Sequence, residues 1–168
     1  MGTVAAHRRL LGASIGEVQA LWLDLARWPA FVDGFSAIAR REGDWPHAGA
    51  RIVWDSLRSG RGRVVEQVTD YEPGVTQIVR IEDPQLRGIQ RARFSACDGG
   101  CELSLELDYE LKQPGIGGRL TDVLFVRRAL GDALRRTLRR FAIELEADRA
   151  LQPEHQRPRP RSRNEKES

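Results

Sequence analysis

The sequence predicts a single α+β domain in which an antiparallel sheet of about seven strands packs against a long C-terminal helix. A capped helix follows one N-terminal strand, strand-like segments separated by turn residues fill positions 35–111, and a long segment with apolar residues at helical spacing comes last. With 168 residues, 40% of them hydrophobic, the chain is long enough to bury about 68–70% of its unfolded surface. One hydrophobic core is therefore expected.

The N-terminal part predicts a strand over 3–11 and a helix directly after it. Ser14 and Glu17 have the Ser-x-x-Glu spacing of a capping box, so the helix is expected to begin at Ile15. It is expected to end near Trp28, because a proline at the next position disfavours helical geometry in the residue before it.

Six further strands are predicted from short apolar runs bounded by turn residues. The last of them is the clearest, because every second residue from Cys101 to Leu111 is apolar or aromatic and the residues between are Glu, Ser or Asp. This alternation indicates a sheet with one buried face and one wet face. The expected strands span 35–42, 50–58, 62–71, 75–83, 87–97 and 101–111.

Charge pairing predicts the register of the last hairpin. If Gly99 and Gly100 form a two-residue turn, Arg93 lies opposite Glu106 on the outer face. A three-residue turn would move the arginines of this strand to the apolar face, so we reject it.

The hairpin before it is expected to turn at 72–74, which places Glu66 opposite Arg80 on the outer face. The inner face is then more polar than a packed core usually is. Buried glutamines with satisfied hydrogen bonds are the simpler explanation, but two of them here, with Gln90 also inward, favour a cavity that hydrogen-bonds a ligand. The inward residues are Val65, Gln67, Thr69, Gln77, Val79 and Ile81.

A long helix is predicted from the glycine-rich break at 114–118 to about Ala150. Its apolar stripe has two gaps, at Arg127 and Gly131. Arg127 either extends to the edge of the sheet with its charge in water or points its guanidinium into a hollow that Gly131 leaves open. The stripe consists of Leu120, Leu124, Leu134, Leu138, Phe141 and Leu145.

Together these faces predict a cavity between the sheet and the last helix that hydrogen-bonds a ligand. We expect Arg127 to hold the polar end of the ligand, with Gln67 or Gln90 as a neutral partner, because a buried guanidinium needs an oxygen partner. The predicted ligand-binding residues are Trp54, Val65, Gln67, Val79, Gln90, Phe94, Leu105, Tyr109, Leu124 and Arg127.

The net charge of +3 is distributed unevenly. Residues 152–168 are polar, charged or proline, so we expect a disordered basic tail after a ligand-binding domain at 1–151. Residues 119–140 hold seven arginines against two aspartates, which a solvated helix face explains most simply. The charge of the domain itself does not suggest nucleic acid. The alternative is contact with an anionic membrane or an acidic partner through Arg135, Arg136, Arg139 and Arg140.

Several other classes of protein have no support in the sequence. No apolar run reaches the roughly 18 residues of a membrane span, and the first residues lack a signal-peptide core, so we expect a cytoplasmic protein. Cys97 and Cys101 lie on opposite faces of their hairpin, so neither a disulfide nor a metal site is expected. No phosphate-loop, dinucleotide or nucleophile motif predicts a cofactor.

Candidates for acid–base catalysis are few. His7 lies on the first strand, His47 in a loop and His155 in the tail, so none is expected to line the cavity. Asp55 and Tyr109 remain as weak candidates. A carrier or sensor is therefore favoured over an enzyme.

The segment from Val18 through Asp24 to Trp28-Pro29 and Phe31 resembles the first helix and Trp-Pro turn of the START-like superfamily, also called SRPBCC or helix-grip. The resemblance covers nearly the whole chain before the tail and is closest to the polyketide cyclase/dehydrase and lipid-transport branch. It implies a curved sheet gripping the last helix, two short helices after the first strand, and an elongated apolar cavity for a lipid, polyketide, quinone or similar ligand. A polyketide cyclase or dehydratase, and an interaction module acting through the arginine-rich helix, are the alternative functions.

Overall fold

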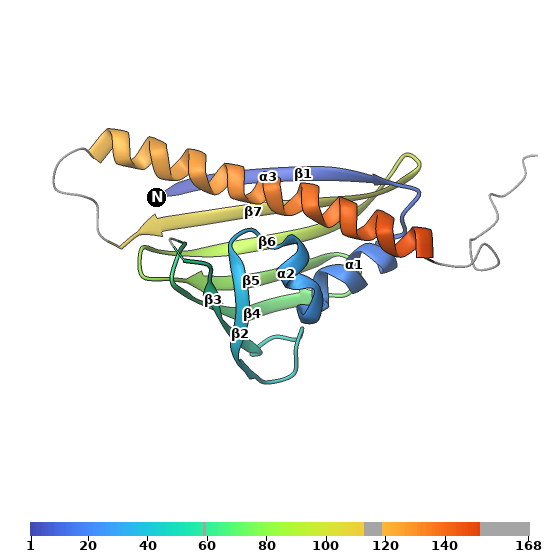
Figure 1. Ribbon diagram of the computed structural model, residues 1–168, viewed down its shortest axis with the longest axis horizontal. Helices are drawn as coiled ribbons and strands as arrows, with labels where there is room; N and C mark the ends of the chain where they lie inside the picture. Colours follow the sequence, from blue (N-terminus) through green and yellow to red (C-terminus); the bar gives the residue numbers. More distant parts are fainter. Residues whose placement is uncertain (59, 113–118, 152–168) are drawn as a thin grey trace, which may run out of the picture.

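The computed structural model describes residues 1–58, 60–112 and 119–151, and it confirms the predicted fold class. Seven strands form one antiparallel sheet in the order β1-β7-β6-β5-β4-β3-β2. One face of the sheet carries the helices, and α3 lies along it beside β1 (Figure 1). The predicted tail lies outside the described residues. The elements are β1 (Gly2–Leu11), α1 (Ile15–Leu23), the 3-10 helix η1 (Leu25–Arg27), α2 (Trp28–Phe31), β2 (Phe35–Glu42), β3 (Arg51–Ser56), β4 (Arg63–Glu72), β5 (Thr76–Glu82), β6 (Leu86–Cys97), β7 (Gly100–Leu111) and α3 (Arg119–Leu151).

The predicted capping box starts α1. Ser14 Oγ accepts from the Glu17 backbone N–H at 3.2 Å, and the Ser14 backbone N–H donates to Glu17 Oε2 at 2.8 Å. The predicted end near Trp28 is wrong, since α1 ends at Leu23. Asp24 ends it by capping η1 through a hydrogen bond from the Ala26 backbone N–H, at 3.1 Å.

The last hairpin has the predicted faces but not the predicted register. Its strands join through Asp98-Gly99, so Arg91 lies opposite Glu106, two residues from the expected pairing. Gly99 has a φ of 77°, which an Asp-Gly turn uses readily. A shift of two residues keeps every side chain on its face, and Cys101 is therefore buried as predicted.

In the hairpin of β4 and β5 the predicted face of β4 is wrong. The pairing shifts between Val68 and Asp70, where β4 carries one extra residue. Such a bulge reverses the two faces of a strand relative to its partner. Glu66 therefore lies opposite Ile81 on the inner face.

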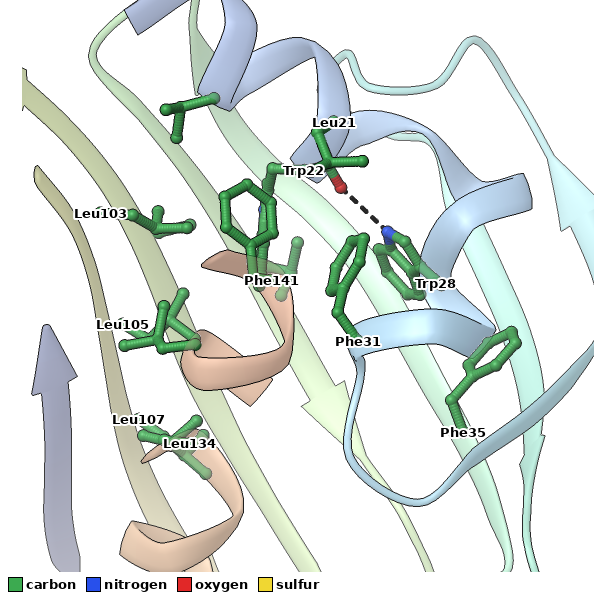
Figure 2. Packing of buried hydrophobic residues seen from close by; sticks show 14 of the residues in the cluster. Leu21, Trp22, Trp28, Phe31, Phe35, Leu103, Leu105, Leu107, Leu134 and Phe141 are labelled. Carbon is green, nitrogen blue, oxygen red and sulfur yellow. Dashed lines mark hydrogen bonds between the residues drawn. The ribbon is translucent and has the colours of Figure 1, made fainter. Parts of the chain in front are cut away.

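The core is formed where α1, α2 and α3 cover the inner face of the sheet. Leu103 and Leu105 of β7 face the α3 residue Phe141, which lies beside Trp22 and Phe31 (Figure 2). The ring centroids of Phe141 are 5.1 Å from Phe31 and 6.1 Å from Trp22, both edge-on. Aromatic pairs of this geometry add to the burial of their area. No helix within 1–58, 60–112 and 119–151 is long and apolar enough to cross a membrane.

Candidate functional site

A small cavity lies between the inner face of the sheet, the α2–β2 turn and the middle of α3, with a volume of about 60 Å³. It has room for a few water molecules and is far smaller than the roughly 300–1,000 Å³ of sites that enclose drug-sized ligands. Its wall is mostly apolar, with a few polar groups that converge on it. The lining residues are Trp22, Trp28, Val32, Asp33, Trp54, Arg61, Glu66, Ile81, Gln90, Leu105, Ala133, Leu134 and Thr137.

Glu66 of β4 is one of the acidic residues in the wall of this cavity. It is 5% exposed, and its Oε1 accepts a hydrogen bond from Trp54 Nε1 at 2.9 Å. Burial raises the pKa of the Glu66 carboxyl, and the Trp54 hydrogen bond and the charge of Arg61 oppose this only in part. The site thus holds a carboxyl group whose neutral form is favoured more than it would be in water.

Arg61, which precedes β4, supplies the positive charge. Its Nε donates to Asp83 Oδ2 at 2.5 Å, and Asp83 has a fully buried side chain that also accepts from the backbone N–H groups of Gln85 and Leu86 at 2.8 Å each. Arg61 Nη2 is buried and has no hydrogen-bond partner among the described residues. A buried donor without a partner is costly, so this nitrogen is suited to an acceptor oxygen in the cavity.

Asp33 and Thr137 close the cavity between the α2–β2 turn and α3. Asp33 accepts from Arg136 Nε at 3.0 Å and from Arg140 Nη1 at 3.2 Å, and its backbone N–H donates to Thr137 Oγ1 at 3.0 Å. Both arginine side chains are 43% exposed. Arg136 also donates from Nη2 to Asp33 Oδ2 at 2.9 Å, so its pair with Asp33 is bidentate, whereas Arg140 makes a single contact.

The structure brings some of the predicted site residues to the cavity. Trp54, Gln90 and Leu105 line it. Three others are buried on the inner face but outside the lining: Val79, Phe94 and Tyr109.

Four predicted site residues do not face the cavity. Val65 and Gln67 lie on the outer face because of the bulge in β4. Leu124 is 60% exposed and Arg127 is exposed, in the first turns of α3, which extend past the start of β1 (Figure 1). The structure thus places Arg127 outside the cavity lining, and its role in holding the polar end of a ligand stays a prediction.

His7, His47 and Asp55, which the sequence offered as catalytic candidates, do not line the cavity either. His7 and His47 are exposed, away from the cavity, and His155 lies outside the described residues. Asp55 lies on the outer face, where hydrogen bonds from Arg63 at 2.8 and 3.1 Å lower the pKa of its carboxyl and keep it ionised.

Three charged residues that line the cavity were not predicted from the sequence: Arg61, Glu66 and Asp33. Val64, Glu66 and Val68 alternate in β4 just as Val65 and Gln67 do, so both faces of this strand were compatible with burial. The pairing of Trp54 with Val64 across β3 and β4 places Val64, Glu66 and Val68 on the inner face.

Glu66→Gln is expected to raise the melting temperature at about pH 8 and to have no such effect near pH 4. The folded-state pKa of Glu66 is raised, so its contribution to stability is present below the unfolded value of 4.5 and is lost as the pH rises through the folded pKa. Glutamine still accepts from Trp54 and cannot ionise. Thermal unfolding from pH 4 to 8 measures this, with Glu72→Gln, an exposed residue of the same strand, as control. A difference independent of pH would contradict the burial of an ionisable Glu66.

A seven-stranded antiparallel sheet with a long C-terminal helix packed along it is the helix-grip fold. Residues 2–146 match the family described as polyketide cyclase / dehydrase and lipid transport, and the chain belongs to this family. The predicted resemblance to the START-like superfamily is thereby confirmed. No functionally curated protein is significantly similar in sequence.

Solved structures show the same fold at low sequence identity. A protein from Thermus thermophilus is 22% identical with a TM-score of 0.70, over 88% of this chain and 99% of that one. A START superfamily protein from Mycobacterium smegmatis is 15% identical with a TM-score of 0.68, over 86% of this chain and 97% of that one. The di-domain ARO/CYC protein of the steffimycin biosynthetic pathway is 15% identical with a TM-score of 0.68, and the match covers 89% of this chain and 52% of that one.

Proposed function

We propose that the protein binds a hydrophobic small molecule, of lipid, polyketide or quinone type, between the sheet and α3, and acts as a carrier or sensor. The observation that carries this is a buried, unpartnered donor, Arg61 Nη2, in a mostly apolar cavity. Membership of a family whose description includes lipid transport supports it.

The polar groups of the cavity favour a ligand with a neutral acceptor oxygen, such as a ketone or quinone. The charge of Arg61 is already balanced by Asp83, and the raised pKa of Glu66 disfavours a second negative charge nearby. An anionic ligand would add a charge with no counterpart. A carbonyl oxygen accepts from Arg61 Nη2 and from neutral Glu66 without that cost.

The cavity must enlarge to take such a ligand. We infer that the α2–β2 turn moves away from α3, because Asp33 connects the two through half-exposed ion pairs and one backbone hydrogen bond. Both arginine side chains reach solvent, so water can replace these contacts when the turn moves.

Nile red, an uncharged apolar dye, is expected to bind the folded protein with increased fluorescence. Ala133 lines the cavity, so Ala133→Trp should fill it and abolish dye binding. Ala129 is exposed one turn earlier on the same helix, and Ala129→Trp should bind like the parent. Dye binding that survives Ala133→Trp would place the site elsewhere. Native mass spectrometry of the purified protein would detect a ligand carried through purification.

A cyclase or dehydratase is the second candidate, and Glu66 is the observation that favours it. A carboxyl with a raised pKa in a cavity is suited to act as a general acid. In that case Glu66→Gln would abolish conversion of an aromatic polyketide substrate without preventing its binding. A carrier converts no substrate, and Glu66→Gln then changes only affinity.

We also propose contact with an anionic membrane or acidic partner, through Arg135 and Arg139 alone. These are two of the four arginines that the sequence predicted for this contact. Arg136 and Arg140 bind Asp33, and Arg135 binds Asp132 at 2.6 Å. Arg139 is exposed and has no carboxylate within 4.0 Å among the residues described. Salt-sensitive association with acidic vesicles should therefore fall in Arg135→Gln/Arg139→Gln.

A further inference from the structure

A second hollow lies on the surface between β1 and α3. This cleft has a volume of about 460 Å³ and shares no lining residue with the internal cavity. Its residues come from the edge strand of the sheet and from two turns of α3, two elements that lie side by side (Figure 1). The lining residues are His7, Arg8, Asp132, Arg135, Arg136, Leu138 and Arg139.

Four arginines line this cleft, and Asp132 is the acidic residue among its lining residues. Arg135 uses that carboxylate at 2.6 Å, and Arg136 contacts Asp33 outside the cleft. For Arg8 and Arg139, which are exposed, no carboxylate lies within 4.0 Å in the described parts of the chain. Positive charges brought together in a concave site raise the local potential and attract anions.

We propose that this cleft binds a phosphate-bearing small molecule. The two arginines without a carboxylate partner among the described residues come from neighbouring elements, Arg8 from β1 and Arg139 from α3, and both line the cleft. Guanidinium forks match the oxygens of a phosphate group with paired, charge-assisted hydrogen bonds. A phosphate monoester or diphosphate offers more oxygens and more charge to four such groups than a single carboxylate does. His7 adds a donor at the rim.

The proposed site rests on the contact with an anionic partner proposed above, because it uses the same two arginines of α3, Arg135 and Arg139. It adds Arg8, which lies on a different element and has no part in a contact made by the helix face alone. The phosphate belongs either to a soluble compound or to a lipid headgroup, and both present the same chemistry to the cleft.

Isothermal titration of the full chain with inorganic pyrophosphate at low salt tests the proposal. We expect saturable binding of one pyrophosphate per chain and a loss of affinity of about tenfold or more in Arg8→Gln/Arg139→Gln, because each lost guanidinium removes hydrogen bonds to a charged group. The control is Arg41→Gln/Arg93→Gln, which removes two exposed arginines of β2 and β6 and changes the net charge equally. It should stay within about twofold of the parent.

If both double variants lost pyrophosphate affinity equally, the binding would be general charge attraction and the site would be overturned. No binding of pyrophosphate by the parent would overturn it too. Vesicles containing phosphatidic acid then separate the two sources. Vesicle binding that requires Arg8 assigns a lipid phosphate, and pyrophosphate binding without vesicle binding assigns a soluble compound. Vesicle binding that needs Arg135 and Arg139 but not Arg8, with no pyrophosphate binding, would overturn the cleft and leave the peripheral contact standing.

Discussion

Phe141→Ala is expected to lower the free energy of unfolding by about 3–5 kcal/mol, the range for truncating a fully buried aromatic residue. Phe141 of α3 is 0% exposed and lies between the aromatic residues of α1 and α2 and the leucines of β7 (Figure 2). The truncation removes the edge-on contacts with Phe31 and Trp22 and leaves a void that a close-packed core does not refill. Urea unfolding followed by tryptophan fluorescence and circular dichroism measures the loss.

Ile143→Ala on the same helix is the control for this substitution. Ile143 is 58% exposed, so its truncation should change stability by no more than about 0.5 kcal/mol. If both variants lost the same amount, the helix would contribute through its own propensity, and the packing of α3 on the sheet would not be what stabilises the domain. Phe141→Leu should lose less than Phe141→Ala, because it fills part of the void.

Features that depend on neighbours in the sequence were predictable. The capping box of Ser14 and Glu17 satisfies groups within one turn, and the alternation in β7 records which face is wet. The Asp98-Gly99 turn was also readable, because Asp-Gly is a stronger hairpin signal than Gly-Gly at this position. Opposite charges alone did not decide that register, since Arg91 reaches both Glu106 at 3.1 Å and Asp108 at 2.6 Å.

The residues that line the cavity could not be predicted from local sequence, because tertiary features decide which side chains face it. One extra residue in β4 turned Glu66 inward and Gln67 outward, and no turn residue marks the bulge in the sequence. The apolar spacing of α3 continues through Leu124, but Leu124 is 60% exposed in the structure. A helical stripe shows which face of a helix is apolar, and tertiary structure decides how much of that face is covered.

Replacing Arg61 by methionine is expected to reduce both stability and ligand preference. The change keeps an unbranched apolar stem but removes the guanidinium group and its donors, leaving the fully buried Asp83 carboxylate without its counter-charge. Breaking a buried ion pair costs about 3–5 kcal/mol, and the 29% exposure of the Arg61 side chain places the expected loss near the lower end.

Arg63→Met tests whether the loss is specific to the buried pair. Arg63 binds Asp55 with side-chain exposures of 64% and 45%, so its replacement should cost less than about 1 kcal/mol. The double variant Arg61→Met/Asp83→Asn should recover part of the stability lost in Arg61→Met, because it removes the uncompensated charge. Failure to recover any would show that Asp83 is stabilised by its backbone hydrogen bonds alone.

The ligand preference is measured with fluorenone and fluorene, two rigid tricyclic probes that differ by one carbonyl group. If Arg61 Nη2 donates to a ligand oxygen, the parent should bind fluorenone more tightly by about 1.5–3 kcal/mol, the contribution of a hydrogen bond to a charged group. Arg61→Met should then bind both probes with the affinity that the parent has for fluorene, whereas Arg63→Met keeps the preference. A parent protein that binds the two probes equally would remove Arg61 from the ligand site, and the unpartnered nitrogen would then have only a structural role beside Asp83.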